Sequence, residues 1–394
     1  MDLFQQFYGV DKDFFVSKTC EHTAQEIAHQ PVMWRKLSSH LQEIKSAVGN
    51  YMDLLGSLDK FRIILTGAGS SGFVGSAVAG FVSEGAGIKC EAIHTTDIVS
   101  APEMCFPSSL TDMPTLLISF ARSGNSPESD GAVRYARKMV KNLYEIAIVC
   151  DGGSRLSNTT RESKNGLVVV MPEGTNDKGF AMTSSVSSMI LAGCAVLRWN
   201  EIDKIASDII LLADNIDKHG PIISKTAADC AKWGFERAWF LGSGPITALT
   251  HEGALKMMEL SNGAVVAGHN NSPEFRHGPK TVINTKTLTI HFISSNDFTA
   301  KYDLDLLNEL NSQRDGNRTI VICNVKCPSQ GDATIHYDTS GYISIPDVAA
   351  GMQGLVFMQL LSMHTSLILG ITTDNPSPGG LVNRVVQGVT VYPY

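Results

Sequence analysis

The chain has 394 residues, more than one ordinary hydrophobic core accommodates, so about two domains are expected. Hydrophobic residues make up 43% and charged residues 18% of the sequence, which indicates a globular protein and excludes a disordered one. The net charge of −7 argues against nucleic acid as a partner.

Signals for export, membrane insertion and metal binding are not found. Among the 8 cysteines, Cys323 and Cys327 lie close together, but no second cysteine pair and no histidine pair follows at zinc-finger spacing. We therefore expect reduced thiols and no metal. Residues 1–15 lack the basic region and long apolar core of a signal peptide. No run of about 18 apolar residues occurs, so no membrane span is expected. These features predict a cytoplasmic protein.

Residues 1 to about 60 have a helical pattern. Thr23 and Glu26 have the spacing of a capping box, and Pro31 suits the first turn of a new helix. Apolar residues then recur at helical spacing, namely Met33, Leu37, Leu41, Ile44 and Val48.

The first half continues as strands separated by helices. Residues 62–66 form an apolar strand that enters the glycine turn 67–72 and then a helix of small residues over 73–82. Further strands are predicted at 89–94, 115–120, 145–150 and 167–171. Apolar strands that alternate with helices indicate a parallel sheet with both faces covered.

The second half repeats this plan after helices at 184–197 and 201–233. A strand at 238–241 enters a second Gly-x-Gly turn, and strands follow at 287–293, 318–323 and 342–345. We therefore predict an α/β fold with two copies of a doubly wound parallel sheet flanked by helices. The division is a helical lead-in over 1–50, one domain over 51–200, and a second over 201–394 that includes a C-terminal tail.

The first glycine turn, Gly67–Gly72, matches the G-x-G-x-x-G pattern of dinucleotide sites. Such a site also needs an acidic residue at the end of the second strand, and Asp97 comes late for that role, so NAD or FAD is disfavoured. A tight turn without a ligand is a second alternative. We favour a phosphate site, because Ser70 and Ser71 add hydroxyl donors to amides at a helix N-terminus.

A second hydroxyl-rich turn follows the predicted strand at 115–120. It contains Arg122, Ser123 and Ser126 and leads into another helix. In a doubly wound sheet both turns lie at the carboxyl ends of strands, where ligands bind, so the two turns can surround one phosphate. An exposed serine-rich loop is the alternative. The sequence lacks the G-x-x-x-x-G-K-[ST] motif of P-loop NTPases.

Acid and base candidates occur in the second half. Glu252, Lys256 and Glu259 share one face of a predicted helix, and His277 follows within Pro273–Pro279. A carboxylate, an ammonium and an imidazole held near each other suit proton transfer on a sugar. Considered separately, Lys256 and Glu259 would form a solvated salt bridge, and His277 would be an ordinary loop residue.

The glycine turn from Gly69 to Ser71 and the loop from Arg122 to Ser126 resemble the phosphate-binding segments of the sugar isomerase (SIS) domain family. Residues 252–261 followed by 276–279 resemble the isomerase half of glucosamine-6-phosphate synthase, without its glutaminase half. Residues 119–129, 178–185 and 383–389 look like those of the AgaS type of tandem SIS protein. The resemblance covers the chain from about Glu26 onward.

This resemblance implies a deaminase/isomerase that converts galactosamine-6-phosphate to tagatose-6-phosphate and ammonia, without a cofactor. We assign ring opening to His277, transfer of the C2 proton to Glu259, and stabilisation or orientation to Lys256. Gln387 stands where the synthase has a lysine, so no Schiff base forms there, although the residue could still contact the sugar.

One further departure from the synthase concerns the phosphate loop. Ala121 replaces its first serine, so Thr183 and Ser184 become candidate phosphate contacts. Simple helix capping is the alternative for both.

The predicted partners are a small phosphosugar and a second copy of the chain. In related enzymes the histidine comes from a neighbouring subunit, so the resemblance implies a homodimer or higher homo-oligomer with a shared active site. Two other functions stay open at this point. One is a ketose/aldose isomerase acting on a 6-phosphosugar, and the other is a non-catalytic sugar-phosphate-binding regulator.

Overall fold

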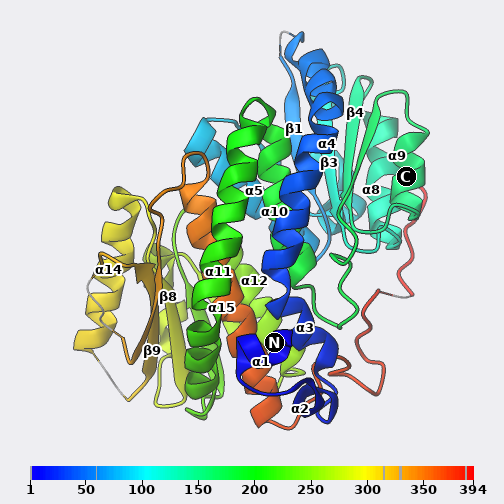
Figure 1. Cartoon of the computed structure of the whole chain (residues 1–394). Coiled ribbons are helices and arrows are strands. Elements are labelled where there is room, and N and C mark those ends of the chain that lie inside the picture. The colour runs from blue at the N-terminus through cyan, green and yellow to red at the C-terminus, as the bar shows by residue number, and fades with distance from the viewer. Residues whose placement is uncertain (1, 59, 314–315, 328–330, 387) are drawn as a thin grey trace. The chain divides into compact units, whose positions relative to one another are not determined.

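The computed structural model describes residues 2–58, 60–313, 316–327, 331–386 and 388–394 (Figure 1). The chain forms two compact units. We call Met33–Asp177, Ser184–Ile209 and Val382–Tyr394 the first-sheet unit. We call Met1–Val32, Lys178–Thr183 and Ile210–Leu381 the second-sheet unit. The domain boundaries expected at residues 50 and 200 stay a prediction.

The first-sheet unit is built on a parallel sheet with the strand order β2-β1-β3-β4-β5. Its strands are β1 (Arg62–Thr66), β2 (Glu91–Ala92), β3 (Thr115–Ala121), β4 (Leu143–Val149) and β5 (Gly166–Val170). The central strand β3 is buried along its whole length, as expected for a strand covered on both faces.

Helices cover both faces of the first sheet. On one face α5 (Ser70–Ala86) packs beside α10 (Ser184–Leu197), as Figure 1 shows. Gly193 of α10 permits this approach, because a Cβ there would lie 2.8 Å from Val78 and 3.0 Å from Phe120. The helices that pack with one another on the other face are α6 (Thr95–Ser100), α8 (Pro127–Met139) and α9 (Arg155–Arg161). Two short helices, α7 (Pro102–Cys105) and η1 (Ser108–Leu110), precede β3.

The second sheet repeats the topology of the first. Its order is β10-β9-β8-β6-β7, which is the first order again when the strands are numbered along the chain. The strands are β6 (Arg237–Leu241), β7 (Val266–Asn270), β8 (Thr287–Phe292), β9 (Arg318–Asn324) and β10 (Ala333–Tyr337). The prediction of two copies of one doubly wound parallel unit is thereby confirmed.

The two faces of the second sheet carry different helices. One face packs on α12 (Ile246–Leu260) and α15 (Pro346–Ile368), which contact each other. The opposite face packs on α13 (Ser272–Phe275) and α14 (Asp297–Ser312), where Leu241, Phe275 and Leu306 form a buried cluster. A 3-10 turn, η3 (Pro279–Val282), follows α13.

The predicted N-terminal helical segment is present. Its helices are α1 (Leu3–Tyr8), α2 (Lys12–Val16), α3 (Glu21–Ala28) and α4 (Gln30–Gly56), and the expected apolar stripe lies on α4. A 3-10 turn, η2 (Trp199–Glu201), precedes the long helix α11 (Ile202–Ala231). Among the described residues, no helix combines the length and the apolar character that a bilayer span requires.

The capping box predicted at Thr23 and Glu26 is wrong. Helix α3 begins two residues before Thr23, and the side chain that caps it comes from far along the chain. Asp374 accepts hydrogen bonds from the backbone of His22 (2.9 Å) and of Thr23 (2.8 Å). Glu26 instead accepts from the backbone of Gly179.

The strand predicted at residues 342–345 is also wrong. Tyr342 and Ile345 are buried, but they lead into α15, which begins at Pro346. The fifth strand of this sheet is β10, at residues 333–337. The edge strand β7 was missed, because its Val-Ala-Gly-His-Asn sequence lacks the apolar run of a buried strand.

His291 lies buried in the central strand β8, and its Nε2 has no hydrogen-bond partner among the described residues. Burial lowers its pKa from 6.5 to about 3. The unfolded chain therefore takes up a proton below pH 6.5, while the folded chain does not until about pH 3.

We expect the free energy of unfolding of the wild type to fall between pH 7 and pH 5 by about 2 kcal/mol more than that of the His291→Gln variant. Denaturant titrations of both proteins at the two pH values measure this difference. An equal pH response of the two proteins would contradict the assignment.

Candidate active site

The first glycine turn connects β1 to α5 and needs glycine for steric reasons. Gly69 has a φ of 54°, and a Cβ on Gly67 would lie 2.5 Å from the backbone of Ser71. The turn places Ser70 and Ser71 at the N-terminus of α5, where both are buried. That helix end carries the positive pole of the helix dipole, which favours a bound anion.

The hydroxyl-rich loop after β3 lies at the same edge of the sheet. Strands β1 and β3 are parallel neighbours in which Thr66 pairs with Ser119, so the loops that follow both strands leave the sheet side by side. Ser126 caps α8, since its hydroxyl accepts from the backbone N–H of Ser129 at 3.3 Å. Ser123 is half-buried, and its hydroxyl oxygen accepts from the backbone of Asn125 at 3.4 Å. The proton of the Ser123 hydroxyl can therefore point to a ligand.

Ser184 is fully buried at the start of α10 and bonds to Asp177. Its backbone N–H and its hydroxyl donate to Oδ1 of Asp177 at 3.0 and 2.7 Å. The backbone N–H of Ser185 donates to Oδ2 at 3.0 Å, and the hydroxyl of Ser185 also donates to Oδ2. Asp177 thus caps α10 from outside the helix, and the hydroxyl of Ser184 donates to Asp177 instead of capping the helix itself.

Two further candidate contacts are Thr183 and Gln387. Thr183 belongs to the second-sheet unit, where its carbonyl accepts from the side-chain amide of Gln359 at 3.3 Å. Gln387 lies outside the described residues. The candidate phosphate contacts at this edge of the first sheet are therefore Ser70, Ser71, Arg122, Ser123 and Ser126.

The predicted cluster on α12 is present in the second-sheet unit. Lys256 is completely buried, and its Nζ lies 3.4 Å from Oε1 of Glu252, which is 1% exposed. Lys256 also forms an ion pair with Glu259, whose side chain is 25% exposed. One ammonium thus faces two carboxylates, and of these Glu259 is the one that reaches solvent. Such a carboxylate, held in place by a buried ammonium, can exchange a proton with a ligand.

His277 is placed on a surface loop of the same unit. Helix α14 holds this loop, because Arg276 forms ion pairs with Glu309 at 2.6 Å and with Asp305 at 2.9 Å. The imidazole of His277 is exposed and makes no hydrogen bond or ion pair with another described residue. No interaction with Glu259 is therefore seen within the described part of the chain.

The carboxyl edge of the second sheet has a different arrangement. The carboxylate of Asp303, on α14, accepts from the hydroxyls of Ser243 (2.6 Å) and Ser272 (2.5 Å) and from the backbone of Ser294 (3.0 Å). These serines follow β6, β7 and β8. Burial raises the pKa of Asp303, and the serine hydrogen bonds oppose that rise. The serine donors that could bind an external anion at this edge are therefore already hydrogen-bonded to the carboxylate of Asp303.

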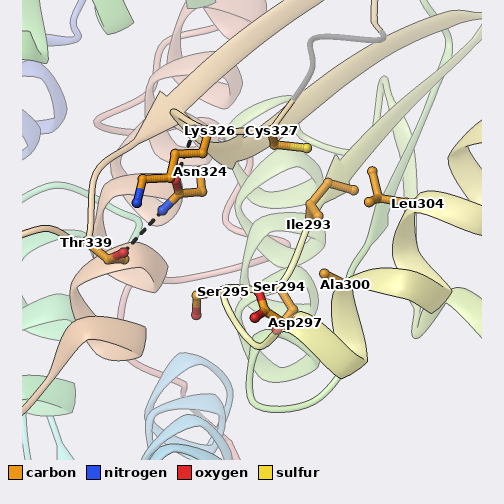
Figure 2. A pocket seen from close by; sticks show the side chains of 10 residues that line it. All are labelled: Ile293, Ser294, Ser295, Asp297, Ala300, Leu304, Asn324, Lys326, Cys327 and Thr339. Carbon is orange, nitrogen blue, oxygen red and sulfur yellow. Dashed lines mark hydrogen bonds between the residues drawn. The ribbon is translucent and has the colours of Figure 1, made fainter.

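A cavity of about 400 Å³ lies beside this edge, and Figure 2 shows its lining side chains. Asn324 donates to the hydroxyl of Thr339 at 3.1 Å, and Ser295 donates to Asp347, so much of the polar lining is already hydrogen-bonded. None of the catalytic or binding residues predicted from the sequence lines this cavity. In the described part of the chain, no group of three or more His, Cys, Asp or Glu side chains could hold a metal ion.

Asp177 and Arg384 also belong to the hydrogen-bond network around the candidate phosphate site, and the sequence did not predict them. Arg384 donates to the backbone carbonyl of Asp177 and to the side-chain oxygen of Asn176 at 3.2 Å. The carbonyl of Arg384 in turn accepts from Arg122 at 2.7 Å. Arg384 lies within residues 383–389, one of the segments that carry the family resemblance, and this position is the signal that could have identified it.

The buried pair on α12 makes a prediction about stability. We expect Lys256→Met to lower the free energy of unfolding by about 3 kcal/mol, because it leaves the buried carboxylate of Glu252 without its cation. The double variant Glu252→Gln/Lys256→Met should recover most of that loss. Urea denaturation measures both values, and Lys225→Met, in an exposed pair with Asp229, is a control expected to show no measurable change. Equal losses in the single and double variants would contradict this reading of the cluster.

The chain is similar to known proteins over most of its length. No family model matches the sequence. The D-galactosamine-6-phosphate deaminase AgaS of Escherichia coli O157:H7 is 36% identical over 94% of this chain and 96% of its own. The solved structure named tagatose-6-phosphate ketose/aldose isomerase from Escherichia coli is 33% identical, with a TM-score of 0.84 over 95% of this chain and 96% of that one.

A third comparison shows the fold alone. The C-terminal domain of glucosamine-fructose-6-phosphate aminotransferase from Francisella tularensis is 18% identical, with a TM-score of 0.71 over 90% of this chain and 97% of that one. The tandem SIS architecture expected from the sequence is thereby confirmed.

Proposed function

This chain belongs to the AgaS family, and we propose that it converts D-galactosamine-6-phosphate and water to D-tagatose-6-phosphate and ammonia. The observation that carries the proposal is the carboxylate of Glu259, partly exposed and held in place by the completely buried Lys256. The similarity to an Escherichia coli deaminase over 94% of the chain supports the same assignment. A phosphorylated substrate favours a cytoplasmic location for the reaction.

The substrate phosphate binds to the hydroxyl-rich edge of the first sheet. Ser70 and Ser71 lie at the N-terminus of α5, and Arg122 and Ser123 follow the neighbouring strand β3. Hydroxyl donors, a guanidinium and a helix dipole together suit a phosphate dianion. The corresponding donors of the second sheet are bound to Asp303, so we assign the phosphate to the first-sheet unit.

The reaction begins with ring opening, in which His277 moves a proton from O1 to O5. Imidazole is the side chain with a suitable pKa for this step near neutral pH. Glu259 then removes the C2 proton of the open aldehyde while O1 takes up a proton from solvent, which gives an enolamine. Glu259 returns its proton to C1, the amine releases a proton to solvent, and a 2-imino sugar results. Water adds at C2 and expels ammonia, leaving the ketose phosphate.

Lys256 does not act as a nucleophile in this scheme. Its ammonium is buried between two carboxylates. In our proposal it fixes the orientation of Glu259 and stabilises the negative charge that develops on O1. No step needs a cofactor, because the proton leaving C2 returns to C1 and the electrons stay within the sugar.

His277 acts, in our proposal, in the site of a neighbouring subunit. Its ring is exposed and makes no polar contact within the described part of its own chain, while its loop is held to α14 by the ion pairs of Arg276. A rigid loop with an exposed imidazole suits a group that completes a partner's site. We therefore propose a homodimer, or a higher homo-oligomer, with a shared active site.

An isomerase acting on a 6-phosphosugar is the alternative, favoured by the name of the Escherichia coli structure. The two functions share the proton transfer and differ in whether nitrogen leaves. An ammonia-release assay on galactosamine-, glucosamine- and N-acetylgalactosamine-6-phosphates separates them. We expect release from galactosamine-6-phosphate, whereas isomerisation of tagatose-6-phosphate without any release would favour the alternative.

Substitution of the proposed base should abolish most of the activity. We expect Glu259→Gln to lower kcat for ammonia release by about 10²- to 10⁴-fold, because the C2 proton then has no acceptor. Glu236→Gln, in an exposed pair with Lys286 at 3.6 Å, is the control and should keep full activity. If the Glu259→Gln variant turns over at the wild-type rate, another residue is the base.

Substitution in the phosphate loop should act on substrate binding. We expect Ser123→Ala to raise KM for galactosamine-6-phosphate about 10-fold, because one charge-assisted hydrogen bond is lost, while kcat changes less. Ser100→Ala serves as the control, since its exposed hydroxyl donates only to the nearby backbone of Asp97. An unchanged KM for the Ser123 variant would remove this residue from the phosphate site.

A further inference from the structure

The C-terminal tail, residues 382–394, belongs to the first-sheet unit although the chain before it belongs to the second-sheet unit. Its far end is attached to α7 and α8. Tyr135 and Lys138 donate to the backbone carbonyls of Tyr392 and Tyr394, and the hydroxyl of Tyr394 donates to Glu103 at 2.8 Å. The tail is thus fixed at its far end to two helices of the first-sheet unit.

The near end of the tail is attached through Arg384. Its Nε donates to the backbone carbonyl of Asp177 at 3.1 Å, and its Nη2 donates to the same carbonyl and to Asn176 at 3.2 Å. A planar guanidinium can make these bonds together, because its N–H groups diverge in one plane, whereas the single ammonium of a lysine cannot match that geometry.

The backbone carbonyl of Arg384 meets the phosphate loop. Arg122, which is 7% exposed, donates from Nη2 to this carbonyl at 2.7 Å. A buried guanidinium needs such acceptors, and each one restricts the direction in which its remaining N–H groups point. The position of the Arg384 backbone therefore influences the orientation of Arg122.

Arg384 consequently connects two loops at the same sheet edge. Through its backbone it holds Arg122 in the loop after β3, and through its side chain it holds Asp177 in the loop after β5. The carboxylate of Asp177 in turn caps α10 through Ser184 and Ser185. No local sequence motif predicts this link, because Arg384 lies 262 residues from Arg122 and 207 residues from Asp177.

We propose that Arg384 is a positioning residue for the phosphate site: by docking the tail on Asp177 it fixes the carbonyl that orients the guanidinium of Arg122 toward the substrate phosphate. This inference rests on the phosphate-binding role proposed above. It does not depend on whether nitrogen leaves the sugar, because orientation of Arg122 affects the phosphate and not the chemistry at C1 and C2.

The test compares Arg384→Ala with Arg161→Ala. Arg161 is a matched control, because it also donates to a backbone carbonyl, that of Gly152 (2.8 Å), and to an asparagine oxygen, that of Asn158 (3.2 Å). Binding of inorganic phosphate is measured by titration calorimetry, and KM and kcat are measured with galactosamine-6-phosphate. We expect Arg384→Ala to weaken phosphate binding and raise KM about 10-fold, with kcat within about threefold of wild type. We expect Arg161→Ala to match the wild type.

A second variant guards against loss of folding. If Arg384→Ala lowers the Tm markedly, Arg384→Lys replaces it, since it keeps the charge and most of the side chain but lacks the planar fork. We expect at least about a threefold loss of phosphate affinity in this variant. Wild-type phosphate affinity in the folded Arg384 variants, or a fall in kcat with KM unchanged, would overturn the proposal.

Failure of the proposed function gives a different result. If the wild type releases no ammonia but Arg384→Ala still weakens phosphate binding, the deaminase assignment fails and the role of Arg384 stands. A wild type that binds no inorganic phosphate would overturn both the phosphate assignment and this inference.

Discussion

The interaction between one buried ammonium and two carboxylates constrains the residues of the proposed active site. Lys256 is completely inside the second-sheet unit, and a lone charge there would be costly, so Glu252 and Glu259 must stay close to it. Helical spacing supplies both partners from α12 itself. Because Glu252 is buried and Glu259 is partly exposed, the cluster has an inner member that satisfies the lysine and an outer member that can exchange protons. The proposed chemistry is a consequence of that asymmetry.

A second asymmetry separates the two copies of the fold. Both sheets have the same strand order, and both place serines after the strands that meet at the carboxyl edge. In the second sheet these serines bond to Asp303, a carboxylate supplied by α14. In the first sheet the glycine turn and the loop after β3 leave Ser123 able to donate outward. The edge of the first sheet is therefore suited to binding an external anion, while the edge of the second sheet is occupied by the carboxylate of Asp303. Repetition of a fold has preserved the topology while allowing the two edges to take different roles.

Local sequence patterns predicted much of this arrangement. The apolar strands, the glycine turn at Gly67–Gly72 and the helix spacing of Lys256 and Glu259 depend on neighbours in the chain, so the sequence alone indicated them. Contacts between distant residues could not be predicted in this way. Asp374 caps α3 across more than three hundred residues, and Arg384 meets Arg122 across more than two hundred. The strand expected at residues 342–345 failed for a related reason, since its buried apolar residues serve the start of α15 and not a sheet.

In the proposed reaction one carboxylate moves a proton between adjacent carbons of an amino sugar that then loses its nitrogen. Galactosamine-6-phosphate carrying deuterium at C2 tests this claim directly, with ammonia measured enzymatically and the position of deuterium in the ketose measured by NMR. We expect one ammonia per tagatose-6-phosphate, with part of the deuterium recovered at C1. Tagatose-6-phosphate with no deuterium at C1, or the absence of both ketose and ammonia, would contradict this mechanism.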